Sequence, residues 1–276
     1  MIDAWYGSER SYREVEQLLN SFELSANKPQ LNKLDDFGSN PVGASISNGL
    51  GVMQIKGSIV TNSSWITRWL GIPSYEDIRE AAAQLAGNVD VKAIVINYDS
   101  PGGAAKGCKS CANYLREIDT KHKPVVSYTN DSACSAAYWL FSAGSQRVIG
   151  EDAQIGSVGA IIVHTEYSEM DKNMGITRTV KRSAPYKALG TPFEKLSEEA
   201  EAELDAELEY LHNLFVTGIA DLTRIPERKV RDTIATGKVF RTEEALRLKM
   251  ADTTLSFGDT LARIAKRINR KPSASK

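Results

Sequence analysis

Residues 91–103 read VKAIVINYDSPGG, a nearly continuous apolar run that ends in a proline–glycine turn. The run is rich in β-branched side chains, which is typical of a strand buried on both faces of a parallel sheet. The two glycines allow the backbone to approach a ligand closely, and a helix beginning there offers unpaired N–H groups. The stretch therefore predicts a buried strand that leads into a functional turn.

The sequence on both sides of this stretch alternates between strand-like and helix-like patterns. Strands are predicted at 51–59, 91–98, 124–128, 147–150 and 158–163. Helices are predicted at 10–24, 74–87, 104–118, 135–143, 197–222, 226–235 and 242–249. Such alternation indicates βαβ units, so the predicted fold is a layered α/β core with a mostly parallel sheet and flanking helices.

Composition divides the chain into three parts. Residues 1–47 combine an amphipathic helix with a linker at 25–47 that is rich in Asn, Ser, Gly and Pro. Residues 48–267 carry the alternating pattern and are predicted to form the main domain. Residues 268–276 read as a basic, flexible tail.

Charge and hydropathy exclude several classes of protein. The formal net charge is −1 over 276 residues, which gives no field for nucleic acid. No apolar run reaches the ~18 residues of a transmembrane anchor, and the N-terminus lacks the apolar core of a signal peptide. The three cysteines suit a reducing compartment, so we expect a cytoplasmic protein. Cys108 and Cys111 spell C-x-x-C once, within a predicted helix, where packing is the favoured interpretation; we expect no metal and no cofactor.

A candidate nucleophile lies in residues 130–139, NDSACSAAYW, between a predicted strand and an apolar helix. Ser135 falls at the first helical turn among small neighbours, which leaves room for a substrate backbone. The positive end of the helix favours developing negative charge there. The alternative is that Ser135 or Ser132 merely caps the helix. The glycines of the earlier turn also have two interpretations, since they suit either an oxyanion hole or an ordinary turn.

A serine nucleophile needs a base, and the residues alone do not select one. Of the three histidines only His164, at the end of a predicted strand, is a plausible base. A lysine acts as a base only when its surroundings keep it neutral. Lys187 lies in SAPYKALG, a segment without acidic residues.

Taken together, five segments resemble the S49 peptidases, which include signal-peptide peptidase A and the head-maturation proteases of tailed phages. VKAIVINYDSPGG resembles the family's oxyanion segment, and SACSAAYWLFSAGSQRVIG resembles its nucleophile segment, although two family glycines are Ala136 and Ala137 here. AQIGSVGAI, RSAPYKALG and IATGKVFRTEEALRLKMAD follow in the family's order, so the resemblance runs over roughly residues 50–265.

The resemblance implies a ClpP/crotonase-like layered fold and a Ser–Lys dyad. It assigns the nucleophile to Ser135 and the general base to Lys187. The oxyanion hole would consist of the N–H groups of Gly103 and Ala136, with Gly102 shaping the turn.

The segment after the nucleophile helix is expected to serve the site in two ways. The Ser157 hydroxyl would orient the lysine. The surrounding strand would pair with an extended substrate, through Gly156, Val158, Gly159 and Ala160.

For function, the resemblance implies a serine endopeptidase that processes scaffold and capsid proteins, and itself, during phage head maturation. It would act in the host cytoplasm or the immature head as a homo-oligomer, with the helices at 10–24 and 197–222 as candidate contacts. Three alternatives remain open: a cellular signal-peptide-peptidase-like protease, a Clp-like Ser–His–Asp protease, and an inactive structural component of an assembly. A crotonase-like acyl-CoA enzyme is a more distant one.

Overall fold

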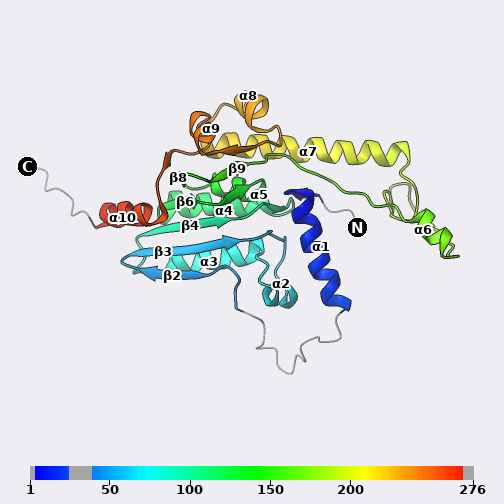
Figure 1. Ribbon diagram of the computed structural model, residues 1–276, viewed down its shortest axis with the longest axis horizontal. Helices are drawn as coiled ribbons and strands as arrows, with labels where there is room; N and C mark the ends of the chain where they lie inside the picture. The colour runs from blue at the N-terminus through cyan, green and yellow to red at the C-terminus, as the bar shows by residue number, and fades with distance from the viewer. Residues whose placement is uncertain (1–3, 25–38, 270–276) are drawn as a thin grey trace, which may run out of the picture.

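A computed structural model describes residues 4–24 and 39–269 (Figure 1). Its centre is a six-stranded sheet in the order β11-β8-β6-β4-β3-β2. Five neighbouring strands run parallel and only the edge strand β2 is antiparallel. The strands are β2 (Ala44–Ser47), β3 (Leu50–Lys56), β4 (Ala93–Asp99), β6 (Val125–Thr129), β8 (Gln146–Ile149) and β11 (Thr253–Thr254). The predicted mostly parallel α/β core is confirmed.

Helices cover both faces of this sheet. The larger core holds α3 (Tyr75–Gly87), α4 (Cys108–Lys121), α5 (Ala136–Phe141) and α7 (Glu198–Thr223), whereas α10 (Phe257–Ile268) packs on the opposite face. Alternate residues of β4 serve the two cores: Ile94 and Ile96 face the first, and Val95 faces the second. The continuous apolar run in the sequence follows from this two-sided burial.

The remaining elements lie outside the six-stranded sheet. The N-terminus supplies β1 (Trp5–Tyr6) and α1 (Glu9–Leu24), and α2 (Trp65–Trp69) follows β3. A second small sheet contains β7 (Ser132–Cys134), β9 (Gln154–Gly156) and β10 (Val239–Arg241). The others are β5 (Gly103–Ala104), α6 (Ser168–Asn173), α8 (Glu227–Lys229), a π-helical turn (Val230–Ile234) and α9 (Thr242–Arg247).

Local capping explains why two of these helices begin where they do. The Ser74 hydroxyl accepts the Asp77 N–H at the start of α3, and the Asp77 carboxylate accepts the Ser74 N–H in return, forming a capping box. The 26-residue α7 begins after Ser197, whose hydroxyl accepts the Ala200 N–H.

Two sequence predictions need revision. The strand predicted at 158–163 does not form, and only Ile161 makes an isolated bridge, to Trp5. The end of the predicted linker, Ala44–Ser47, is strand β2, while residues 25–38 of that linker and 270–276 of the tail lie outside the described residues. Across the described part of the chain, no helix is long and apolar enough to cross a membrane.

Candidate active site

Ser135 occupies a strained position between β7 and α5. Its backbone has φ +53° and ψ −121°, a conformation that a non-glycine residue rarely adopts. Its N–H donates a hydrogen bond of 2.6 Å to the Gly156 carbonyl, which fixes it beside β9. The side chain makes no capping hydrogen bond to α5, so a capping role does not explain this serine.

The hydroxyl of Ser135 is buried without a hydrogen-bond partner in the described chain. The residue is 1% exposed. An unpaired buried hydroxyl costs free energy, on the order of 1–3 kcal/mol. A strained, unpaired serine at a helix start is what a preorganised nucleophile requires, because its oxygen remains available to a substrate.

The proline–glycine turn lies directly against this serine. Two backbone hydrogen bonds join it to β7: Ser100 N–H to the Ser132 carbonyl at 2.8 Å, and Cys134 N–H to the Ser100 carbonyl at 3.0 Å. Gly102 has φ +116°, and a Cβ at this position would lie 2.9 Å from the Ser135 Cβ. Only glycine fits there, because of both the conformation and the close approach.

The two expected oxyanion donors are the chain neighbours of Gly102 and Ser135, which approach each other closely. Gly103 follows the turn in β5, where a Cβ would overlap the Ile59 backbone. Ala136 is the first residue of α5, so its N–H has no acceptor within the helix. The structure thus brings Gly102, Gly103 and Ala136 to Ser135.

The segment after β9 contributes backbone rather than a free strand. Gly156 already pairs with Cys134 on one side and Val239 on the other. Ser157 is half-buried with φ +52°, and its N–H donates to the Lys238 carbonyl at 2.7 Å. Beyond it, Val158 is buried. Gly159 and Ala160 are half-buried and belong to no strand.

Neither expected base hydrogen bonds the Ser135 hydroxyl among the described residues. Lys187 is exposed on the segment 162–197, which carries α6 and extends away from the sheet (Figure 1). It does not hydrogen bond the Ser135 hydroxyl, which has no partner. His164 lies on the same segment, with Nε2 3.3 Å from the Thr191 carbonyl.

The three cysteines are free and buried. Cys108 and Cys111 belong to the main core, so the packing interpretation of C-x-x-C is confirmed. Burial raises the pKa of the Cys111 thiol to about 12 and also raises that of Cys134, the neighbour of Ser135. Cys134 therefore stays protonated near neutral pH and is a poor nucleophile.

Sequence reasoning missed the N-terminal strand beside this site. Trp5–Tyr6 pairs with Gly103–Ala104, and Trp5 also bridges Ile161. The apolar pair Trp5-Tyr6 just before the predicted helix was the only available signal. Its partners lie about a hundred residues or more further along the chain, where no local pattern could reveal them.

Comparison with known proteins gives a consistent result. Residues 117–271, more than half of the chain, match the model of Peptidase family S49, and the glycine turn precedes that range. The head-tail preconnector protein GP5 of Enterobacteria phage P21 is 28% identical over 81% of this chain and 44% of its own length. The capsid assembly protease C of Escherichia phage lambda is 27% identical over 78% of this chain and 48% of its own length. The chain thus spans about half the length of these relatives.

Among solved structures, an enoyl-CoA hydratase/isomerase from Marinobacter aquaeolei aligns with a TM-score of 0.52 at 10% identity. The alignment covers 83% of this chain and 76% of that one. At so low an identity the likeness establishes the fold alone, and it confirms the crotonase-like layered class.

Proposed function

The chain belongs to peptidase family S49, and on that basis we propose that it is a serine endopeptidase with Ser135 as its nucleophile. The observation that carries the proposal is the state of this serine. It is strained and buried, and its hydroxyl is unpaired. It lies against a turn that approaches it so closely that only glycine fits at position 102. Most buried hydroxyls in proteins have a hydrogen-bond partner. The buried hydroxyl of Ser127 also lacks one, so the positive φ and the adjoining glycine turn are what distinguish Ser135.

In the proposed mechanism, Ser135 Oγ attacks the carbonyl carbon of the peptide bond while its proton passes to neutral Lys187. The N–H groups of Gly103 and Ala136 stabilise the negative oxygen, and Gly102 shapes the turn that presents them. Lys187 then gives the proton to the leaving amine, which frees the C-terminal product and leaves an ester on Ser135. Water hydrolyses the ester and restores both groups. Ser157 would orient the lysine.

We further propose that the lysine reaches the serine from a second copy of the chain. The segment that carries Lys187 stands away from the body and exposes several large apolar side chains: Tyr167, Met170, Met174, Ile176 and Tyr186. Exposed apolar residues gathered on one segment are typical of an interaction surface. A closed homo-oligomer would bury them and could bring each lysine to a neighbouring serine.

The proposed biological role is phage head maturation, with scaffold and capsid proteins, and the enzyme itself, as substrates. Its support is the similarity to a capsid assembly protease over 78% of this chain. The test is to co-express the chain, or its Ser135→Ala variant, with candidate phage scaffold and capsid proteins, and to measure the intact mass of every product. Ser135-dependent trimming of a head protein is expected. Trimming of membrane-released signal peptides alone would favour the cellular peptidase instead.

A further inference from the structure

The first described residues of the chain form an extended strand inside the candidate active site. Trp5 exchanges two backbone hydrogen bonds with Ile161, each of 3.0 Å. On the other side, Ala105 N–H donates to the Ala4 carbonyl at 3.2 Å, within the pairing of β1 with β5. Residues 4–6 are thus held from both sides, between the segment after the glycine turn and the segment after β9.

The carbonyl of Tyr6 points toward Gly103, one of the two expected oxyanion donors. Successive residues of a strand direct their N–H and C=O groups to opposite sides. Since Trp5 faces Ile161, Tyr6 faces Gly103, its partner in the register. A Cβ added at Gly102 would overlap the Tyr6 carbonyl oxygen and would lie 2.9 Å from the Ser135 Cβ. This carbonyl therefore lies next to the nucleophile.

The side chain of Tyr6 fills a closed aromatic pocket. It is 0% exposed, and its hydroxyl donates a hydrogen bond of 2.9 Å to the Leu211 carbonyl. Its ring lies 4.6 Å from that of Phe215 and 5.8 Å from that of Trp139, centroid to centroid. Trp139 belongs to α5, the helix that begins at the nucleophile. Burial raises the pKa of Tyr6, so its hydroxyl remains a donor at working pH.

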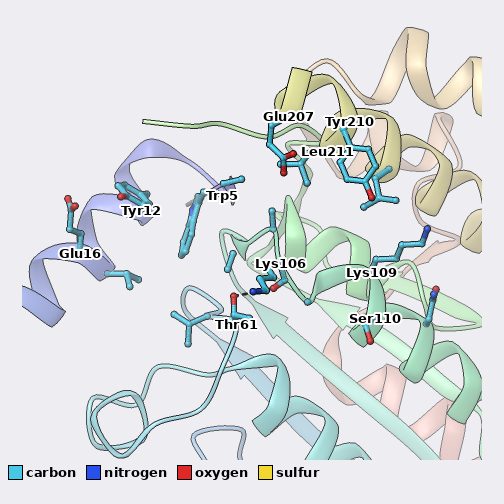
Figure 2. Close-up of a pocket in the computed structure, with 18 residues that line it drawn as sticks. Trp5, Tyr12, Glu16, Thr61, Lys106, Lys109, Ser110, Glu207, Tyr210 and Leu211 are labelled. Carbon is cyan, nitrogen blue, oxygen red and sulfur yellow. Dashed lines mark hydrogen bonds between the residues drawn. The ribbon is translucent and has the colours of Figure 1, made fainter. Parts of the chain in front are cut away.

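A cavity of about 920 Å³ opens beside this strand. Figure 2 shows Trp5 on the side of α1, and Tyr210 with Leu211 on the side of α7. Trp5 lines this cavity, so in a peptide placed as residues 4–6 are, the residue before the tyrosine would border it. A volume of this size is ample for a large side chain.

An extended peptide binds a protein edge by adding a strand, with pockets for alternate side chains. We propose that residues 4–6 lie in the substrate groove of their own chain as a substrate would. The pocket of Tyr6 is then the subsite for the residue preceding the cleaved bond, and the substrates are extended segments with an aromatic residue, tyrosine above all, at that position. This proposal rests on the proposed protease function.

The test uses the full chain and a quenched fluorescent peptide with the sequence of residues 3–9, DAWYGSE. Matched peptides carry Tyr6→Phe or Tyr6→Ala. Cleavage is expected after the tyrosine, and the products are identified by mass. The Tyr6→Ala peptide should lose kcat/KM on the order of tenfold to a hundredfold, because an aromatic ring leaves an apolar pocket. The kcat/KM of the Tyr6→Phe peptide should fall by about twofold to tenfold, because phenylalanine lacks the hydroxyl that makes the hydrogen bond.

Cleavage elsewhere, or equal rates for the tyrosine and alanine peptides, would overturn the proposal. Casein digestion and labelling by a fluorophosphonate probe distinguish this failure from failure of the protease function. If casein is cut and Ser135 is labelled, but the peptides show no tyrosine preference, only the subsite assignment is wrong. If casein stays intact and Ser135 is unlabelled, the protease function itself is wrong.

A conservative variant tests whether the built-in strand and the substrate share one groove. Tyr6→Phe in the chain removes the hydrogen bond to Leu211, so the strand should leave more readily. Cleavage of the DAWYGSE peptide should then rise by about twofold to tenfold. Tyr128→Phe is the matched control, because Tyr128 is equally buried but packs in the core on the opposite face of the sheet. Equal rates in the two variants would show that the groove is not shared.

Discussion

The backbone N–H of Ser135 donates to the carbonyl of Gly156 at 2.6 Å, and this contact joins the candidate nucleophile to β9. The hydrogen bond holds the serine at φ +53° with its hydroxyl unpaired. Strain and an unpaired hydroxyl at one residue lower stability, and a protein retains such a residue when its activity requires it. The site therefore makes predictions about stability as well as activity.

Removing the side chain of Ser135 should stabilise the protein. Ser135→Gly relieves the positive φ and removes an unpaired hydroxyl, so the free energy of unfolding should rise by about 1–2 kcal/mol. Ser132→Ala is the control, since its hydroxyl donates to the Ser100 carbonyl at 3.2 Å and its loss should lower stability. Urea titrations measure both. A Ser135→Gly variant less stable than wild type would contradict the strain argument.

Gly102→Ala should abolish activity and lower stability. Its φ of +116° strains any side chain, and the new Cβ would meet the Tyr6 carbonyl and the Ser135 Cβ. The free energy of unfolding should fall by about 2–3 kcal/mol, and proteolysis should fall to background. Gly57→Ala provides the control, because Gly57 has φ +82° but no atom within 4 Å of the added Cβ. The free energy of unfolding of Gly57→Ala should fall by about 1 kcal/mol, and the variant should remain active. An active Gly102→Ala enzyme would remove the turn from the site.

Lys187→Ala and Lys187→Arg should each abolish proteolysis, because alanine has no basic group and a guanidinium cannot take up the serine proton. If the dyad forms between copies, mixing inactive Ser135→Ala with inactive Lys187→Ala should restore activity. One mixed site then holds both intact residues. Casein assays of the two variants, alone and mixed, test this.

Two results would count against the lysine assignment. An active Lys187→Ala protein would remove Lys187 from the mechanism, and His164→Ala would then test the remaining base. A mixture as inactive as its components would mean that the dyad does not form between copies. Sedimentation that shows only monomer at micromolar concentration would point the same way.

Cys134 should react slowly with iodoacetamide in the folded protein at pH 7.5. Burial raises its pKa, so the thiol stays protonated there, and the reactive thiolate increases only at more alkaline pH. Intact mass before and after treatment measures the reaction, and urea-unfolded protein, in which all three thiols react, is the control. Rapid alkylation of Cys134 in the folded chain at pH 7.5 would show that it is a competing nucleophile.

Much of the fold was predictable because its signals are local. The β4 run is apolar on both faces, and the Ser74 capping box marks the start of α3. The family motifs also predicted that the glycine turn and Ser135 would meet. The N-terminal strand was not predictable, because Trp5 bonds to Ile161 across more than 150 residues. The segment after Gly156 has the apolar pattern of a strand, but the only bridge it makes among the described residues is that of Ile161 with Trp5, which no local pattern reveals.

The most direct test of the account is casein cleavage by wild-type protein and Ser135→Ala, with Ser132→Ala as the control. The change removes a single oxygen from a helix start, so circular dichroism should show an unchanged fold. Wild type and Ser132→Ala should cleave casein, whereas Ser135→Ala should show no cleavage above a buffer blank. Cleavage at the wild-type rate by folded Ser135→Ala would contradict the assignment of Ser135, because the nucleophile would then lie elsewhere.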